Sequence, residues 1–255
     1  MEGIFTSEAL VSLLTVTLME IVLGIDNVVF IAIISGKLPE SQRIKARNIG
    51  LVLALVPRVI LLLFISWLMG LDGILIDFEV LDNHIQISEK GMVLMAGGLF
   101  LLYKGTSEIH EKMEGEGSLE APTKKKSLSF TNAIVQIVLL NIVFSFDSIL
   151  TAVGLANEVW IMITAVIIAL LITLLFVSKI SSFVERHPTV KVLALSFLLL
   201  IGFLLVAESI IWNEHEVHVP KGYIYFSMAF ALFVEIINLR VRTKPEPEEV
   251  HTQDK

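Results

Sequence analysis

The chain has 255 residues, of which 55% are hydrophobic and only 18% carry a charge. A water-soluble domain of this size could not hide so much apolar surface, so the composition favours a membrane protein. The absence of cysteine excludes disulfides, thiolate metal ligands and cysteine nucleophiles, and the formal net charge of −7 argues against nucleic acid as a partner.

Apolar stretches of about 20 residues predict membrane-spanning helices. Such stretches follow one another at residues 8–34, 48–69, 91–107, 130–155, 160–183, 192–212 and 222–239. No Lys or Arg precedes Lys37, so the first stretch lacks the positive start of a cleaved signal peptide and is predicted to remain as a helix. We therefore expect an all-α membrane protein with about seven transmembrane helices, in a single transmembrane domain that covers residues 1–242.

Basic residues alternate between the connections of these helices. The first, third and fifth connections each carry several Lys or Arg residues, whereas residues 70–89 of the second connection and the whole fourth connection carry none, and the sixth has only Lys221. The positive-inside rule then places the N-terminus outside and the C-terminus in the cytoplasm, and we expect a bacterial cytoplasmic membrane. Residues 108–129 are predicted to be a flexible cytoplasmic linker, and residues 243–255 a disordered cytoplasmic tail.

The first and fourth helices carry related polar patterns. Residues 20–27 have the sequence EIVLGIDN and residues 141–148 the sequence NIVFSFDS. In each segment an Asp lies six residues after a polar side chain and directly before a small polar one. Because the two helices are predicted to run in opposite directions, we expect two inverted three-helix repeats, 8–107 and 130–212, plus an extra C-terminal helix. Transporters built this way bind their substrates near the membrane midplane, between the repeats.

The polar side chains of both segments fall on one face of their helix. At 100° per residue, Glu20 and Asn27 share a stripe of the first helix, and we expect the two helices to cross there. The two stripes and the carboxylates that border them predict a metal site made of Glu20, Asp26, Asn27, Asn141, Asp147 and Ser148.

Carboxylates at bilayer depth need compensation, because an Asp at a helix centre costs roughly 2.5–3.5 kcal/mol. A bound divalent cation, water or an internal cation would supply it, and Arg58 beside Pro57 in the second helix is one such internal partner. Carboxylate, amide and hydroxyl oxygens are hard ligands that suit Mg²⁺, Ca²⁺ or Mn²⁺. No His lies within the predicted spans, which disfavours zinc, copper and nickel.

The segments at 20–27 and 136–148 resemble the two signature helices of the TerC family of integral membrane proteins. GLFLLYK at 98–104, EIHE at 108–111 and PKGYIY at 220–225 add to the resemblance. The family is named for tellurium resistance, and the resemblance implies manganese efflux. It also implies that Asp26, Asn27, Asp147 and Ser148 belong to a metal pathway, and Gln136 and Arg58 are taken as supporting residues. The chain departs from the family at Asn141, where the family usually has Asp.

The leading hypothesis is an integral membrane transporter that exports a hard divalent cation, with Mn²⁺ first among the candidates. It implies no enzymatic activity and no resident cofactor; membrane lipid and the metal ion are the expected partners, and a homo-oligomer is left open. One alternative is a membrane scaffold or metal-delivery protein. Another is an intramembrane aspartyl protease, although Ile25 stands where its Gly-x-Gly-Asp motif needs the second Gly.

Overall fold

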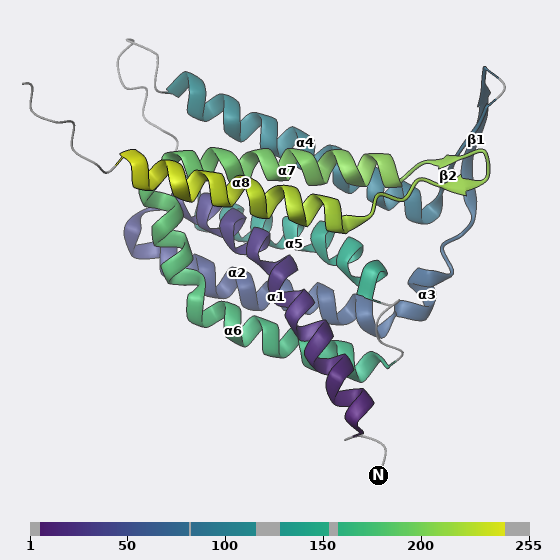
Figure 1. The fold of residues 1–255 in the computed structure, drawn as a ribbon, viewed down its shortest axis with the longest axis horizontal. Helices are drawn as coiled ribbons and strands as arrows, with labels where there is room; N and C mark the ends of the chain where they lie inside the picture. The colour runs from purple at the N-terminus through teal and green to yellow at the C-terminus, as the bar shows by residue number, and fades with distance from the viewer. Residues whose placement is uncertain (1–5, 82, 116–127, 153–157, 243–255) are drawn as a thin grey trace, which may run out of the picture. The chain divides into compact units, whose positions relative to one another are not determined.

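A computed structural model describes residues 6–81, 83–115, 128–152 and 158–242 (Figure 1). Within the helices, it does not describe the side chains of residues 23, 25, 26, 112–115, 151, 152 and 242. The chain forms two compact units, Met1–Val219 and Pro220–Lys255. Most of the predicted linker and all of the predicted tail lie outside the described residues.

Long helices form most of the described part of both units. The first unit contains α1 (Ser7–Gly36), α2 (Glu40–Leu63), α3 (Ile65–Met69), α4 (Glu89–Gly115), α5 (Phe130–Ala152), α6 (Val159–Arg186) and α7 (Pro188–Glu208). The second unit contains α8 (Lys221–Arg242). In the described part of the chain, six helices are long and apolar enough to cross a membrane: α1, α2, α5, α6, α7 and α8. The prediction of an all-α membrane protein is therefore confirmed.

Several helices differ in extent from the predicted spans. The predicted span at 91–107 lies within α4, which continues to Gly115 and does not reach the apolarity of the other six. The span predicted at 48–69 is interrupted at Phe64, which separates α2 from α3. Hydropathy marks only the part of a helix that suits hydrocarbon, so polar helical ends escape it.

A small antiparallel sheet joins two connections that are far apart in the sequence. Its strands are β1 (Ile74–Val80), β2 (Asn83–Ser88), β3 (Ile211–Trp212) and β4 (His215–Glu216), in that order. Asn213 reinforces the junction, because its Oδ1 accepts a hydrogen bond of 2.8 Å from the backbone N–H of His84. The α3–α4 and α7–α8 connections therefore lie at one end of the first unit.

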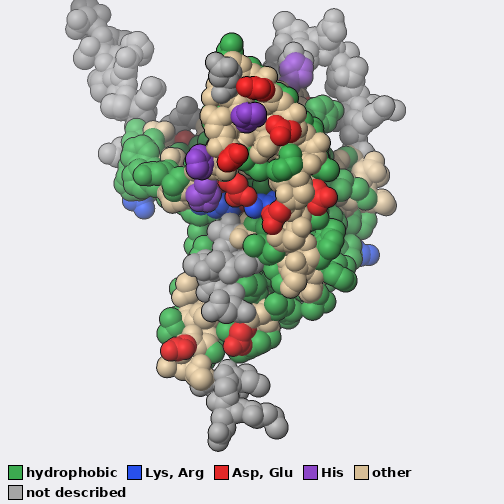
Figure 2. Space-filling model, turned by 90° about the vertical axis from the view of Figure 1, so that its right-hand side faces the viewer, with side chains coloured by type: hydrophobic (Ala, Val, Ile, Leu, Met, Phe, Trp, Pro, Cys, Tyr) green, Lys and Arg blue, Asp and Glu red, His purple; other side chains and the backbone are tan. Residues whose placement is uncertain are grey.

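Figure 2 looks onto the end of the molecule that carries the sheet. Acidic and histidine side chains gather there among hydrophobic ones. The strands contribute the exposed side chains of Asp77, Glu79, His84, His215 and Glu216. The polar residues of these two connections thus form one polar surface, which the sequence patterns alone did not predict.

The helices of the first unit pack in pairs. α1 packs mainly against α6, α2 against α5, and α4 against α7. Phe30 of α1 also stacks on Phe144 of α5 with 5.7 Å between ring centroids, so the two helices with related polar patterns touch. In the predicted repeat, α1 corresponds to α5 and α2 corresponds to α6. The α1–α6 and α2–α5 pairs are then equivalent to each other, which agrees with an inverted repeat. The repeat itself remains a prediction.

Glycine allows α4 and α7 to approach closely. A Cβ on Gly98 would lie 2.6 Å from the carbonyl oxygen of Gly202, and a Cβ on Gly202 would lie 3.0 Å from that of Gly98. Gly91 and Gly105 lie seven residues before and after Gly98. A Cβ on Gly105 would press on side chains of α7, and one on Gly91 on the backbone of Ser209 directly after α7. Small residues at such spacing let membrane helices pack backbone to backbone.

Candidate functional site

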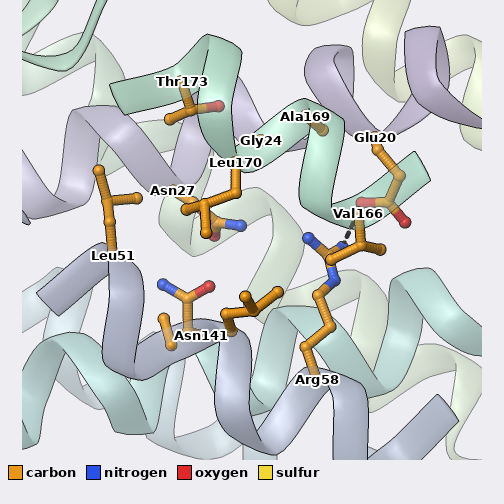
Figure 3. Close-up of a pocket in the computed structure, with 12 residues that line it drawn as sticks. Glu20, Gly24, Asn27, Leu51, Arg58, Asn141, Val166, Ala169, Leu170 and Thr173 are labelled. Atoms are coloured by element: carbon orange, nitrogen blue, oxygen red, sulfur yellow. Dashed lines mark ion pairs between the residues drawn. The ribbon is translucent and has the colours of Figure 1, made fainter. Parts of the chain in front are cut away.

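A small cavity of about 40 Å³, lined by both polar and apolar side chains, lies where α1, α2, α5 and α6 meet (Figure 3). A cavity needs about 10–15 Å³ of this kind of space to hold one water, so this cavity has room for an ion or a few waters. Its polar and small lining residues are Glu20, Gly24, Asn27, Arg58, Asn141 and Thr173, and apolar side chains complete the wall.

An ion pair crosses the cavity between α1 and α2. Nη2 of Arg58 lies 2.6 Å from Oε2 of Glu20, and both side chains are largely buried, at 12% and 3% exposed. The same Nη2 donates a hydrogen bond of 2.8 Å to Oγ of Ser148 on α5, and Ser148 in turn donates to the carbonyl oxygen of Ser145. Arg58 thus connects three helices and supplies the internal cation that the sequence predicted for a buried carboxylate.

Several buried oxygens around this pair lack a hydrogen-bond partner within the described part of the chain. The side-chain amides of Asn27 and Asn141 point toward each other across the cavity (Figure 3). Oδ1 of Asn27, which lines the cavity, is buried without a hydrogen bond from any described residue. The same holds for Oγ1 of Thr17 on α1 and Oγ of Ser145 on α5, which do not line it. Native proteins satisfy most buried acceptors. Unsatisfied hard oxygens beside a carboxylate therefore indicate a place for water or a cation.

The predicted site residues divide into two groups. Glu20, Asn27 and Asn141 line the cavity, and Ser148 reaches it through Arg58. The half-buried side chains of Asp147 and Gln136, which both belong to α5, are not among its lining residues. The side chain of Asp26 lies outside the described residues. Among those that are described, no three His, Asp or Glu side chains form a group that could hold a metal.

The wall of the cavity that α6 provides was missed by the sequence analysis. Ala169 and Thr173 line the cavity, and Ala165 lies one turn before Ala169 with its side chain fully buried. The spacing of Ala165, Ala169 and Thr173 at four-residue intervals marks a stripe of small side chains. Such stripes are typical of helix contacts in membranes, so the signal was present in the sequence.

Comparison with known proteins decides the family. The family model described as "Integral membrane protein TerC family" matches residues 5–247, which is nearly the whole chain. The chain belongs to the TerC family. This TerC-family protein is 48% identical over 233 residues to the UPF0053 inner membrane protein YgdQ of Escherichia coli strain K12, with 91% of this chain and 93% of YgdQ covered.

Other relatives of the TerC-family protein support the same assignment. A UPF0053 protein of Haemophilus influenzae is 44% identical over 241 residues, with 94% of this chain and 98% of the relative covered. The UPF0053 inner membrane protein YoaE of E. coli strain K12 is also 44% identical, over 93% of this chain but only 44% of YoaE. No solved structure gives a significant match. The family and the apolar helices together make the chain an integral membrane protein.

A second charged cluster explains one of the segments that resembled TerC proteins, EIHE at 108–111. Nζ of Lys37, which follows α1, lies 2.7 Å from Oε2 of Glu108 and 2.5 Å from Oε2 of Glu111. Lys104 approaches Glu108 to 2.9 Å from its own helix. These ion pairs tie the α1–α2 connection to the end of α4, beyond the predicted third span.

A second set of ion pairs joins the start of α2, directly after this connection, to α6. Glu185 of α6 pairs with both Arg43 and Arg47 of α2. Nε of Arg47 also donates a hydrogen bond of 2.9 Å to Oγ of Ser35 near the end of α1. The α1–α2 connection of the TerC-family protein is therefore held on two sides.

The ion pairs of the Lys37 cluster shift the pKa values of its members. Burial alone would raise the pKa of Glu108, but Lys37 and Lys104 outweigh it and hold this pKa below its usual value of 4.5. Burial alone would lower the pKa of Lys37, but Glu108 and Glu111 hold it above its usual 10.5. The stabilisation is therefore complete between about pH 4.5 and 10.5. It is lost as pH falls through the lowered pKa of Glu108 or rises through the raised pKa of Lys37.

Replacing Glu108 with Gln is expected to destabilise the TerC-family protein by about 2 kcal/mol at pH 7, because it removes the buried charge that both lysines contact. Thermal unfolding in detergent, followed from pH 3 to pH 8, measures the effect. The matched control is Glu111→Gln, since Glu111 is 67% exposed and its loss should cost less than about 0.5 kcal/mol. A Glu108→Gln deficit that persisted unchanged at pH 3 would contradict this account.

Proposed function

We propose that this TerC-family protein transports a hard divalent cation across the membrane, with Mn²⁺ leaving the cytoplasm as the leading substrate. The observation that carries the proposal is the cavity between α1, α2, α5 and α6, where the buried carboxylate of Glu20 lies with the side-chain oxygen of Asn27, which has no hydrogen-bond partner in the described part of the chain. A structural cavity between apolar helices would have no need of these groups, because each is costly in a bilayer.

The ligands that we propose come from both related helices. Glu20 supplies the negative charge, and Asn27 and Asn141 supply amide oxygens from α1 and α5. All are oxygen donors, which favour Mn²⁺, Mg²⁺ or Ca²⁺ over metals that prefer nitrogen or sulfur. Asp26 and Asp147, which lie beside this set in the sequence, are proposed to extend the pathway. The amide of Asn141 gives the site one charge fewer than the Asp usual in the family.

Access to the site would alternate by movement of the two proposed repeats relative to each other. Transporters with inverted repeats expose a midplane site first to one side and then to the other. Protons would compete with the metal for the carboxylates, so exchange of metal for protons is the proposed driving force. The transport proposal assigns no covalent reaction to the protein, whereas the protease alternative would require one.

Reconstitution into liposomes provides the test. The wild-type protein should move Mn²⁺ across the bilayer, measured with a trapped fluorescent indicator, and Glu20→Gln should slow this flux at least about tenfold, because a charged ligand is worth about 1.4 kcal/mol or more. Glu8→Gln is the matched control, since Glu8 is exposed in the first turn of the same helix.

Equal incorporation of all variants, measured by immunoblot, separates a transport defect from a folding defect. The proposal fails if wild-type liposomes move Mn²⁺, Ca²⁺ and Mg²⁺ no faster than protein-free liposomes. Unchanged Mn²⁺ flux in Glu20→Gln would instead remove Glu20 from the site. In cells, deletion of the gene should raise manganese content if the direction is outward.

A further inference from the structure

Arg58 is a positive charge inside the cavity that we propose for a cation. Its Nη2 lies 2.6 Å from Oε2 of Glu20, whereas its buried Nε has no hydrogen-bond partner in the described part of the chain. An arginine that served only to join helices would be expected to use all its buried donors. Its position beside Glu20, with one donor that no described residue accepts from, instead suggests an arrangement that changes during function.

The guanidinium group would compete with a metal ion for the carboxylate oxygen of Glu20. Metal–oxygen distances for hard divalent cations are about 2.0–2.6 Å, and Nη2 of Arg58 is 2.6 Å from the carboxylate oxygen of Glu20. Glu20 and Arg58 are the charged residues in the lining, so their charges cancel. A divalent cation on Glu20 would place three positive charges against one negative charge, and the two cations would repel each other.

The hydrogen bond to Ser148 gives Arg58 a second anchor. Ser148 belongs to α5 and accepts from the same Nη2 at 2.8 Å, so the guanidinium can leave the α1 carboxylate and remain attached to α5. The arginine side chain is long and flexible, and it keeps its charge at every pH that a protein tolerates. These are the properties that a displaceable internal cation requires.

We propose that Arg58 is a built-in countercation: it pairs with Glu20 when no metal is bound, is displaced by the incoming divalent cation, and returns when the metal leaves. This proposal rests on the transport function proposed above. Its consequence concerns the step in which the protein, after releasing its metal, turns its empty site back toward the side from which metal is taken up. We call the protein in this step the metal-free carrier. Arg58, in place of a proton, neutralises Glu20 during that step, so the protein can change its access without carrying an unpaired carboxylate through the bilayer. The protons exchanged for the metal would then bind the other carboxylates of the proposed pathway.

Two kinds of flux distinguish this role from a structural one. Net efflux into a metal-free solution requires the metal-free carrier to return, whereas exchange of radioactive for non-radioactive Mn²⁺ does not. Arg58→Gln should therefore reduce net efflux about tenfold or more while leaving exchange within about threefold of wild type. It should also lower the apparent Kd for Mn²⁺ about tenfold, because the competing paired state is gone. Arg58→Lys should restore net efflux.

Liposomes that hold each purified full-length variant provide both measurements, and Mn²⁺ titration of the same protein in detergent gives the Kd. Arg186→Gln is the matched control, since Arg186 is an exposed arginine at the end of α6. Arg58→Met, which keeps similar volume without charge, serves as a second neutral variant if Arg58→Gln is not incorporated.

The outcomes separate the two proposals. If wild-type liposomes show neither net efflux nor exchange, the transport function fails and the countercation role fails with it. If wild type transports but both neutral variants lose net efflux and exchange equally and bind Mn²⁺ no more tightly, Arg58 is a structural residue. If the neutral variants keep wild-type net efflux, the metal-free carrier does not need Arg58 to return, and the countercation proposal is wrong.

Discussion

Replacing Gly98 with Ala is expected to destabilise the protein by about 1–3 kcal/mol, although the same change usually stabilises a helix. Alanine is favoured over glycine within helices by about 1 kcal/mol. At Gly98, however, the new Cβ would lie 2.6 Å from the carbonyl oxygen of Gly202. That oxygen belongs to the backbone of α7, so it can move only if the helix moves. The overpacking should outweigh the gain in helix propensity.

Thermal unfolding of purified protein in detergent measures this difference. Gly222→Ala is the matched control, because it also lies in a helix and a Cβ there would meet no atom within 4 Å. The control should be as stable as wild type or slightly more stable. Gly202→Ala, with 3.0 Å between its Cβ and the oxygen of Gly98, should show an intermediate loss. If Gly98→Ala proved as stable as Gly222→Ala, the close contact of α4 and α7 would be wrong.

Removing one partner of the Glu20–Arg58 pair should destabilise the protein by about 3–5 kcal/mol, because the other charge is left buried and unpaired. Replacing both partners, as in Glu20→Gln with Arg58→Met, should cost much less than the sum of the two single changes. The expected coupling energy is about 2 kcal/mol or more. The double variant should nevertheless transport no Mn²⁺, since the proposed ligand is gone.

A double-mutant cycle of unfolding free energies measures the coupling. The pair Lys90–Glu216 is the control, because its atoms are 3.5 Å apart and Glu216 is 67% exposed. An exposed pair of this kind should couple by less than about 0.5 kcal/mol. Additive effects at Glu20 and Arg58 would mean that the two charges do not depend on each other in the folded protein.

The membrane class and the helices were predictable from sequence because bilayer thickness fixes the length of an apolar span. Hydropathy does not predict the structure of segments that lie outside the hydrocarbon core of the membrane, such as the sheet. The segment ILIDFEV that forms β1 alternates apolar and acidic side chains from Ile76 to Val80, which is a strand pattern. Its pairing through β2 with β3 depends on a connection more than a hundred residues away, at Ile211, which no local pattern specifies.

The candidate site was predictable in part for a similar reason. The polar spacing on α1 and α5 identified Glu20, Asn27 and Asn141, because residues of one helical face share their surroundings. Asp147 borders that face, and whether it reaches the cavity depends on the rotation of α5, which packing against α2 determines. The stripe of small residues that includes Ala169 and Thr173 marks a contact face of α6 in the sequence, but which helices that face meets depends on the tertiary arrangement.

The contact between Gly98 and Gly202 has a consequence for inheritance. All other amino acids have a Cβ, and the space beside Gly98 is filled by backbone of α7. Serine, alanine, valine or any other residue reached by one nucleotide change would therefore force the two helices apart. No single-nucleotide substitution at this codon replaces glycine with a residue that lacks a Cβ. Substitutions of Gly98 should therefore be removed by selection even where the cation site itself is intact.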